Sequence, residues 1–486
     1  MNLWIRSILA FSLFIFSFTQ EAFARRIWQE NGVPLATGTG WEVMECIIDD
    51  ESGAGGKGGN LIVFWHEGEY PLERLYAQSV DISGNIRWAP GGVEVSSRSG
   101  RQYSAVAVPD LAGGCLVFWM DHQGTNEQIY GQHLDSSGNR LWGTAGMAVC
   151  PYSGNQLLPN AVSDGSGGAV VAWIDDRNDI GNEDSDIYAQ RITKQGTRLY
   201  PADGSLVCYA TTPESYPYML SDGSGGVFIC WRTSGYTELI DIYAQKLNAE
   251  GIIQWGVYGA AVCTASEYQG DPAIAHGASG KYWVAWEDHR SGDTEIYMQS
   301  LSPSGVSLWA ANGQSIGGYS DHAFSPSMVS DGAGGAFVSY RAERWGSTGL
   351  YLRHIRDTGA LLFHDDMPVY EGPGLTGVWA GPDARPAGMV KDGHGGCFMV
   401  WPLDDNVDPQ CYVQHISSRY RKSYGGSGMP VTATTVPQNY SLIVQNGMKK
   451  AVVAWQDWWR RVYPDIYAQR FMVQPPLSGV VPLLLE

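Results

Sequence analysis

Basic residues are scarce in this chain of 486 residues, which contains 31 Lys and Arg against 50 Asp and Glu and has a formal net charge of −19. Recognition of nucleic acid or of an anionic membrane surface requires clusters of Lys and Arg. The charge balance therefore argues against both classes of partner. Beyond the N-terminal segment the sequence also has no apolar stretch of transmembrane length, so we expect no insertion into a membrane.

Short catalytic motifs are missing as well. The chain contains no His-Glu-x-x-His, no nucleophile elbow and no Gly-rich phosphate-binding loop. No segment shows convincing helical periodicity, which argues against a helical fold class. The absence of a recognisable catalytic set favours a binding or scaffold protein over an enzyme.

The first 24 residues have the features of a cleaved signal peptide. Arg6 supplies the positive charge, residues 8–18 form an apolar core, and Ala22-Phe23-Ala24 is a small-x-small cleavage site. The Cys that would mark a lipoprotein anchor is missing near this site. We therefore expect a protein that is secreted, periplasmic or at the cell surface.

A unit of about 54 residues is repeated eight times along the rest of the chain. In each unit an apolar run ends in an aromatic residue, and a Tyr follows about eleven residues later. The run-ending aromatics are Trp65, Trp119, Trp173, Trp231, Trp286, Tyr340, Trp401 and Trp455. The following Tyr residues are Tyr76, Tyr130, Tyr188, Tyr243, Tyr297, Tyr351, Tyr412 and Tyr467. A fixed period of this kind is typical of repeat architectures.

The third unit shows how each repeat is built. Residues 156–163 and 169–173 are predicted strands on either side of a tight Asp-Gly-Ser-Gly-Gly turn at 164–168. Residues 186–192 alternate apolar and polar side chains, as a half-exposed strand does, and residues 198–208 are predicted as a fourth strand. Eight such units predict an all-β fold, an eight-bladed β-propeller of four-stranded antiparallel blades.

The last unit lacks a fourth strand, because the chain after Tyr467 soon enters a Pro-rich tail. Residues 26–33, around Trp28, resemble a fourth strand without its first three. We therefore predict that this N-terminal strand completes the C-terminal blade, which closes the ring and removes an open sheet edge. The predicted organisation is a signal peptide at 1–24, a single propeller domain at 25–471 and a C-terminal tail at 472–486.

The eight cysteines are expected to be buried free thiols that pack as small apolar residues. Cys150, Cys208 and Cys263 occupy one equivalent position in three consecutive units, and Cys115 and Cys397 share another. Equivalent positions in neighbouring units are further apart than the ~4.4–6.8 Å that separates the Cα atoms of a disulfide.

Two recurring polar features are interpreted as parts of the scaffold. His133, His354 and His415 lie three residues after the repeat Tyr, where we predict an outward polar position on a strand and no metal triad. Arg177 belongs to a Trp-x-Asp-x-Arg element and is predicted to form an exposed salt bridge with Asp186 across a hairpin, which would contribute little to stability.

The longest loop between second and third strands lies in the third unit. Asn182, Asp184 and Asp186 alternate along it with the spacing of a loop site for a hard cation. Ile187 stands where an EF-hand loop would have Gly, so that motif is not present. Two interpretations stay open: a solvated acidic loop that needs no cofactor, and a Ca²⁺ site formed by these three side chains.

The expected functional face carries the loops between second and third strands together with the connections between blades, because variable loops on a rigid scaffold carry binding sites. The irregular segments of units 7, 8 and 1 are neighbours in the ring. Their aromatic and basic side chains suit stacking on sugars or binding of a peptide. The predicted ligand-binding residues are Trp41, Trp379, Arg385, Trp458, Trp459 and Arg460.

We predict an exported, monomeric, non-catalytic propeller that recognises a glycan or a protein through this loop face. One alternative is a polysaccharide-active hydrolase or lyase whose paired carboxylates come from Glu67, Asp121, Asp288 and Asp457. A second alternative is a structural surface spacer that has no ligand.

The repeats resemble those of secreted bacterial β-propeller proteins. The resemblance rests on the Asp-Gly-Ser-Gly-Gly…Trp pattern at 164–173 and on Asp-Ile-Tyr-Ala-Gln at 186–190, 241–245 and 465–469, and it extends over 26–471. It implies the fold and no particular activity. Residues 81–88 also look like the tryptophan-docking motif of eight-bladed quinoprotein dehydrogenases, but the adjacent cysteines of those enzymes are missing. This second similarity therefore implies a turn that locks neighbouring blades and no redox chemistry.

Overall fold

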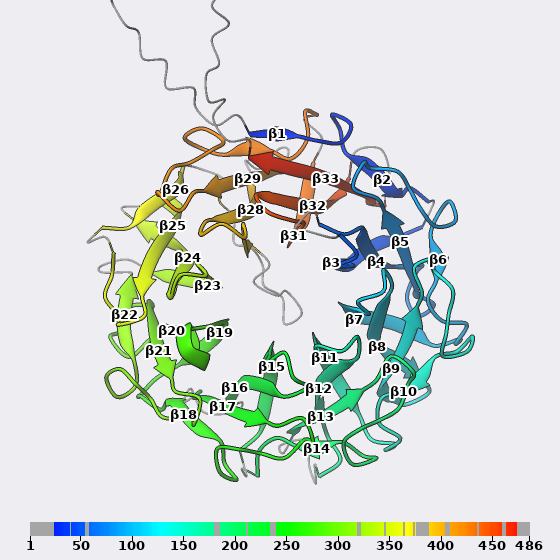
Figure 1. Ribbon diagram of the computed structural model, residues 1–486, viewed down its shortest axis with the longest axis horizontal. Coiled ribbons are helices and arrows are strands. Elements are labelled where there is room, and N and C mark those ends of the chain that lie inside the picture. The colour runs from blue at the N-terminus through cyan, green and yellow to red at the C-terminus, as the bar shows by residue number, and fades with distance from the viewer. Residues whose placement is uncertain are drawn as a thin grey trace, which may run out of the picture.

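The computed structural model shows a closed ring of eight antiparallel sheets (Figure 1). The predicted eight-bladed propeller is therefore confirmed. The residues that the structure describes are 24–38, 40–53, 58–178, 185–209, 212–233, 240–317, 322–344, 347–362, 365–372, 375, 388–403, 409–434, 437–458 and 463–473. The only helical element among them is the short 3-10 helix η2 (Ala278–Gly280).

The first four blades follow one another along the chain. Blade 1 consists of β3 (Glu42–Asp49), β4 (Leu61–Glu67), β5 (Arg74–Val80) and β6 (Val93–Glu94). Blade 2 consists of β7 (Arg101–Pro109), β8 (Cys115–Gln123), β9 (Asn126–Leu134) and β10 (Met147–Ala148). Blade 3 consists of β11 (Gln156–Ser163), β12 (Ala169–Asp175), β13 (Asp186–Ile192) and β14 (Ser205–Leu206). Blade 4 consists of β15 (Glu214–Ser221), β16 (Val227–Thr233), β17 (Ile242–Leu247) and β18 (Ala260–Cys263).

The remaining blades complete the ring. Blade 5 consists of β19 (Gln269–His276), β20 (Tyr282–Asp288), β21 (Glu295–Leu301) and β22 (Gln314–Gly317). Blade 6 consists of β23 (Ala323–Ser330), β24 (Gly335–Arg344), β25 (Ser347–Arg356) and β26 (Met367–Glu371). Blade 7 consists of β27 (Met389–Lys391), β28 (Cys397–Leu403), β29 (Gln410–Ile416) and β30 (Met429–Pro430). Blade 8 consists of β31 (Gln438–Gln445), β32 (Lys450–Asp457) and β33 (Asp465–Val473), with β1 (Ala24–Arg26) and β2 (Val33–Ala36) added at its edge.

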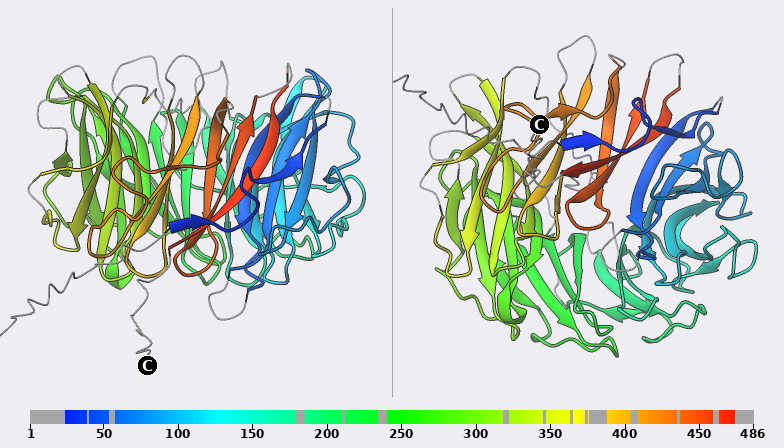
Figure 2. Two further views of the ribbon diagram at one scale, coloured as in Figure 1. Left: turned by 90° about the horizontal axis from the view of Figure 1, so that it is seen from above. Right: turned by 45° about the horizontal axis from the view of Figure 1, so that its top comes forward.

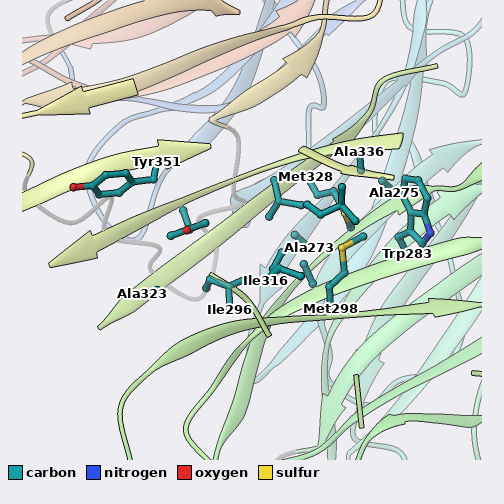
Figure 3. Packing of buried hydrophobic residues seen from close by; sticks show 14 of the residues in the cluster. Ala273, Ala275, Trp283, Ile296, Met298, Ile316, Ala323, Met328, Ala336 and Tyr351 are labelled. Carbon is teal, nitrogen blue, oxygen red and sulfur yellow. The ribbon is translucent and has the colours of Figure 1, made fainter. Parts of the chain in front are cut away.

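The core lies between adjacent blades. The second strands are continuous apolar runs because both of their faces are covered, and in β12 every residue is buried. Figure 3 shows one such interface, where Trp283 and Met298 of blade 5 lie together with Met328 and Ala336 of blade 6. Burial of these large side chains on both faces of each sheet drives the stacking of blades around the ring.

The fourth strand of a blade is interrupted, where the sequence predicted one continuous strand at 198–208. In blade 3 a single bridge joins Arg198 to Ile192, and regular pairing resumes only at β14. The buried side chain of Gln190 bonds the backbone where the strand pairing is interrupted. Its Nε2 donates to the carbonyl of Pro201 at 2.8 Å, and its Oε1 accepts from the backbone N–H of Tyr200 at 2.9 Å. The Gln of the repeated Asp-Ile-Tyr-Ala-Gln sequence thus satisfies backbone groups that the ladder leaves unpaired.

The ring is closed by the N-terminal segment, as the sequence predicted. Both β1 and β2 pair with β33 of blade 8. Between them the backbone N–H of Trp28 donates to Gln469 Oε1 at 2.9 Å, and the Trp28 indole donates to the carbonyl of Ile82 at 3.1 Å. Trp28 thereby joins blade 8 to the turn between β5 and β6 of blade 1. Gly84 in that turn, at φ +90°, allows the close approach, because a Cβ there would lie 3.0 Å from the indole.

The Asp-Gly turns lie on one face of the ring, which we call the turn face. Asp164 is typical: its Oδ1 accepts from the backbone N–H groups of Ser166 and Gly168, both at 2.8 Å. The same arrangement occurs at Asp110, Asp222, Asp331 and Asp392. The aspartates therefore cap the turns through their own side chains.

The outward position predicted for three histidines is wrong. His133 and His415 are buried, and His354 is largely buried; each ring places Nε2 2.8–2.9 Å from the carboxylate of the turn aspartate in its own blade. Arg191 bonds Asp164 in the same way in blade 3. The side chain at this strand position points between blades toward the turn, so its polar character reflects a buried partner and not contact with solvent.

Because of the aspartates in these turns, we expect the folded protein to lose stability in acid. Burial raises the pKa of Asp110, Asp164, Asp222, Asp331 and Asp392, but hydrogen bonds to the ionised carboxylates outweigh burial, so the net pKa of each is lowered. A lowered folded-state pKa gives stability that is present above the unfolded pKa of about 3.9 and is lost as the pH falls through the folded values. We expect the urea midpoint to fall steeply below about pH 4.

The matched control for this pH dependence is Asp222→Asn, which keeps an acceptor oxygen for the turn but does not titrate. Its stability should depend less on pH over the same interval than that of the unaltered chain. Urea unfolding followed by tryptophan fluorescence at neutral and acidic pH measures both. Equal midpoints for the unaltered chain at pH values on either side of about 4 would contradict the prediction.

The cysteines agree with the sequence interpretation. All eight cysteines are buried free thiols. Within the described ranges no helix has the length and apolar character needed to cross a membrane.

Candidate functional site

The loops between second and third strands and the connections between blades share the face opposite the Asp-Gly turns. This follows from the strand order, because each blade begins and ends at the same end of its sheet. Figure 2 (left) shows the ring edge-on, with the strands running from one face to the other. We call this the loop face.

Three aromatic side chains from distant parts of the chain meet on the loop face, at the junction of blades 8 and 1. Trp41 precedes β3, whereas Trp458 follows β32 and Tyr463 precedes β33. The ring centroid of Trp41 lies 5.7 Å from that of Trp458 and 5.5 Å from that of Tyr463, with the rings edge to face in both pairs. All three side chains are half-buried. The structure therefore brings together two of the residues that the sequence predicted, Trp41 and Trp458.

The aromatic surface continues along blade 1 toward blade 2. The hydroxyl of Tyr463 donates to Glu69 at 3.2 Å, and Tyr70 beside it is 77% exposed. The Arg101 guanidinium lies 3.9 Å from the centroid of Tyr103 and 5.3 Å from that of Tyr70. We call Trp41, Trp458, Tyr463, Tyr70 and Tyr103 the aromatic arc.

Sequence reasoning missed Tyr463 and Tyr103. Tyr70 and Tyr463 lie in the second-to-third-strand loops of blades 1 and 8, which the repeat identifies as loop-face segments. An aromatic residue in such a loop is a signal from which Tyr463 could have been predicted. Tyr103 lies inside the inner strand β7, and only the fold shows that it reaches the same surface.

Several predicted residues are not placed by the structure. Trp379, Arg385, Trp459 and Arg460 lie outside the described residues, and so do Asn182 and Asp184. Asp186 is described and buried, and its Oδ2 accepts from the side-chain amide of Asn178 at 2.7 Å. Among the described residues, no group of three His, Cys, Asp or Glu side chains is arranged to hold a metal ion. The calcium site stays a prediction.

The Trp-x-Asp-x-Arg element forms a buried ion pair, and the exposed salt bridge predicted for Arg177 with Asp186 is wrong. Arg177 pairs with Asp175, two residues earlier, with Nη2 2.6 Å from Oδ2 and Nε 2.7 Å from Oδ1. The indole of Trp173 donates to the same carboxylate at 2.7 Å, and the guanidinium lies 3.7 Å from the ring centroid of Tyr188. The two repeat aromatics thus hold the pair between them.

Two of the four carboxylates proposed as catalytic are also held in buried ion pairs. Asp288 is fully buried, is bonded through both oxygens by Arg290 and accepts from the indole of Trp286 at 2.7 Å. Asp121 is buried beside Arg98, with Nε 3.0 Å from Oδ1. The side chains of Glu67 and Asp457 are half-buried at the ends of their strands. Asp121 and Asp288 therefore belong to the blade framework.

No family model and no curated protein sequence matches this chain. Among solved structures, a polysaccharide lyase, Uly1, is similar at 8% identity over 74% of this chain and 88% of its own, with a TM-score of 0.44. An alpha-L-arabinofuranosidase from Fusarium graminearum has 10% identity over 89% of this chain and 97% of its own, with a TM-score of 0.36. An alpha-L-arabinanase from Penicillium chrysogenum, complexed with arabinobiose, has 10% identity over 74% and 89%, with a TM-score of 0.34. At these identities and TM-scores the similarities assign neither activity nor substrate.

Proposed function

We propose that this propeller is an exported carbohydrate-binding protein that holds a glycan on the aromatic arc of its loop face. The observation that carries the proposal is the cluster of Trp41, Trp458 and Tyr463, which joins blades 8 and 1. Edge-to-face packing fixes the rings in place, so little side-chain entropy is lost when a ligand binds.

The chemistry of the arc suits a sugar ring. The apolar face of a pyranose or furanose packs on an aromatic ring, while its hydroxyls require donors and acceptors at the rim. Glu69, bonded to the Tyr463 hydroxyl, and Arg101, stacked beside Tyr70 and Tyr103, provide such groups next to the rings. A peptide partner is the competing occupant, and the test below separates it from a glycan.

Export is part of the proposal. Its support is the composition of the first 24 residues. The aromatic arc would then face carbohydrate outside the cytoplasm, in the medium, in the periplasm or at the cell surface. Fractionation of cells that produce the full chain tests this point, and retention in the cytoplasm would contradict it.

Binding should depend on the two tryptophans. We expect Trp41→Ala and Trp458→Ala each to weaken the affinity for a bound glycan by about 10- to 30-fold, as truncation of a central aromatic contact does. Glycan arrays identify the ligand, and isothermal titration calorimetry with that oligosaccharide measures the change.

The control is Tyr258→Ala, which removes an aromatic side chain of comparable size that is 63% exposed and lies at the outer edge of blade 4. Its affinity should equal that of the unaltered chain. Binding that is insensitive to both tryptophan substitutions would remove the arc as the site. Capture of peptides but no glycan would replace carbohydrate with protein as the ligand class.

A further inference from the structure

The turn between β3 and β4 of blade 1 differs from the corresponding turns of the other blades. It closes where the backbone N–H of Asp50 donates to the carbonyl of Asn60, whereas in blade 2 the N–H of Asp110 donates to the carbonyl of Gly114. The residue before the turn is Asp49 in blade 1. In blades 2 to 8 this position carries Pro109, Ser163, Ser221, His276, Ser330, Lys391 and Gln445. Blade 1 therefore combines a longer, Gly-rich turn with a carboxylate that no other blade has at this position.

This turn forms one wall of a cavity on the turn face, between blade 1 and its two neighbours. In Figure 1, β3 lies between β31 and β7 on the inner side of the ring. The cavity has a volume of about 420 Å³. Its apolar side chains come from all three blades: Ile47, Ile48, Pro109 and Val444. Its charged side chains are Asp49 and Glu51, and no Lys or Arg of the described residues lines it.

The Asp49 carboxylate is fixed in position by neutral groups. Its Oδ1 accepts from the backbone N–H groups of Glu51 and Gly59, both at 2.8 Å, and its Oδ2 accepts from the side-chain amide of Asn446 at 2.8 Å. A Cβ on Gly59 would lie 2.4 Å from Asp49 Oδ1, so glycine is needed for this approach. The three bonds orient the carboxylate but supply no opposite charge.

The two carboxyl groups of the cavity favour an added positive charge. Burial raises the pKa of Asp49, and it outweighs the three hydrogen bonds that this carboxylate accepts. Burial also raises the pKa of Glu51, and the charge of Asp49 adds to this effect against the charge of Lys391. Surroundings that disfavour the ionised form of a carboxyl group are compensated when a cation binds beside it.

Asn446 adds an unsatisfied acceptor at the cavity wall. The residue is 1% exposed, and its Nδ2 donates to Asp49 and to the carbonyl of Gly59 at 3.0 Å. Its Oδ1 accepts no hydrogen bond within the described part of the chain. A Cβ on Gly58, which lines the cavity, would lie 2.9 Å from Asn446 Cγ. A buried acceptor without a donor is uncommon in folded proteins, and a bound donor accounts for it.

These features favour an organic cation over a metal ion. Ca²⁺ takes six to eight oxygen ligands, whereas apolar side chains form much of this wall. Among the described residues, no group of three His, Cys, Asp or Glu side chains is arranged for a metal. An ammonium group has three N–H donors and one positive charge, which suits two carboxylates and an amide oxygen.

We propose that this cavity binds a primary ammonium group carried on an aliphatic chain, as in polyamines and in the side chain of Lys. Asp49 and Glu51 compensate the charge, and the methylene groups pack on the apolar side chains of the three blades. The formal net charge of −19 attracts such cations to the protein. Residues 54–57 of the turn, which include Lys57, lie outside the described residues and are not part of the proposed site.

Ligand-observed NMR titrations of the full chain test the site with propylamine, pentylamine and pentanol. The affinity should rise by about fourfold for each methylene group that separates the two amines, because burial of a methylene contributes about 0.8 kcal/mol. Pentanol has the length of pentylamine but no charge, so its affinity should be at least about tenfold lower. Equal affinities for pentanol and pentylamine would overturn the proposal.

Two substitutions test the carboxylates. Glu51→Gln should weaken pentylamine binding by about two- to fivefold, as loss of an exposed ionic partner does, and it leaves the fold intact because Glu51 is exposed. Asp49→Asn keeps an acceptor for the two backbone N–H groups and should weaken binding by about tenfold or more. The matched control is Glu250→Gln, which removes an exposed carboxylate from the turn between β17 and β18 of blade 4 on the same face. Its affinity should equal that of the unaltered chain.

Two further probes identify the source of the ammonium group: cadaverine represents a free amine, and end-blocked Gly-Lys-Gly represents a polypeptide. Tighter binding of cadaverine would support a free amine, and tighter binding of the peptide would support a Lys side chain. Failure of both to bind, or binding that is unchanged by Glu51→Gln and Asp49→Asn, would overturn the site. Glycan affinity should be unaffected by Glu51→Gln, because the aromatic arc lies on the opposite face, so this site and the proposed function are tested separately.

Discussion

Replacement of Asp288 by Ala is expected to lower the free energy of unfolding by about 3–5 kcal/mol. The carboxylate is fully buried and accepts hydrogen bonds from Arg290 and from the indole of Trp286. Without it, the guanidinium stays between the repeat aromatics with no opposite charge, and a core indole loses its acceptor. Such a loss exceeds the net value of the pair itself, because the remaining guanidinium is only 20% exposed and its charge is poorly solvated.

Chemical denaturation monitored by fluorescence measures this change, and the chain has a suitable control. Asp357 pairs with Lys281 at 2.7 Å, but its side chain is 35% exposed. Asp357→Ala should cost less than about 1 kcal/mol, because solvent screens a surface pair. Equal losses for the two substitutions would show that Asp288 contributes no more than a surface carboxylate.

Trp28→Ala should be comparably destabilising, at about 3–5 kcal/mol, and should also open the ring. The indole is 8% exposed, packs between blades 8 and 1 and donates to the carbonyl of Ile82. Its loss leaves a cavity at the one junction that is closed by strands from opposite ends of the chain. We expect β33 to exchange its amide hydrogens faster, because β1 and β2 are its edge partners.

Trp88→Ala is the control, because Trp88 is 6% exposed and docks blade 1 onto blade 2 in the same way, through a bond to the carbonyl of Ser136 at 3.2 Å. It should cost a similar free energy while leaving exchange in β33 unchanged. Hydrogen exchange with mass spectrometry resolves the two positions. Protection of β33 that is unaffected by Trp28→Ala would contradict the closing role of this residue.

The blade count and ring closure could be predicted because they depend on local and periodic information. An apolar run ending in Trp, a Gly-rich turn and an alternating strand specify one hairpin wherever they occur. The segment around Trp28 resembles a fourth strand without its first three, and the unit at Tyr467 lacks its fourth strand. The two were therefore predicted to form one blade. The interrupted fourth strand was not predictable in this way, because the Gln190 side chain bonds backbone groups about ten residues further along the chain.

The candidate sites could be predicted only in part. Trp41 and Trp458 were selected because they lie in irregular segments of neighbouring blades, and the structure brings them into contact. Tyr103 was missed, because it lies inside the inner strand β7, where the repeat shows no irregularity. Its approach to Arg101, which also faces Tyr70, comes from the fold, and no periodic pattern reports such a neighbourhood.

The sequence by itself determined the architecture of this protein: eight hairpin-based units, their order, and the pairing of the N-terminal strand with the last blade that closes the ring. Only the tertiary structure decided which polar side chains have a buried partner and which are exposed. His133 illustrates the reason, since its strand position is polar in every case but its partner, Asp110, is supplied by a turn more than twenty residues away. Strand periodicity reports which face of a sheet a side chain occupies, whereas the chemistry of a propeller arises where the faces of adjacent blades meet.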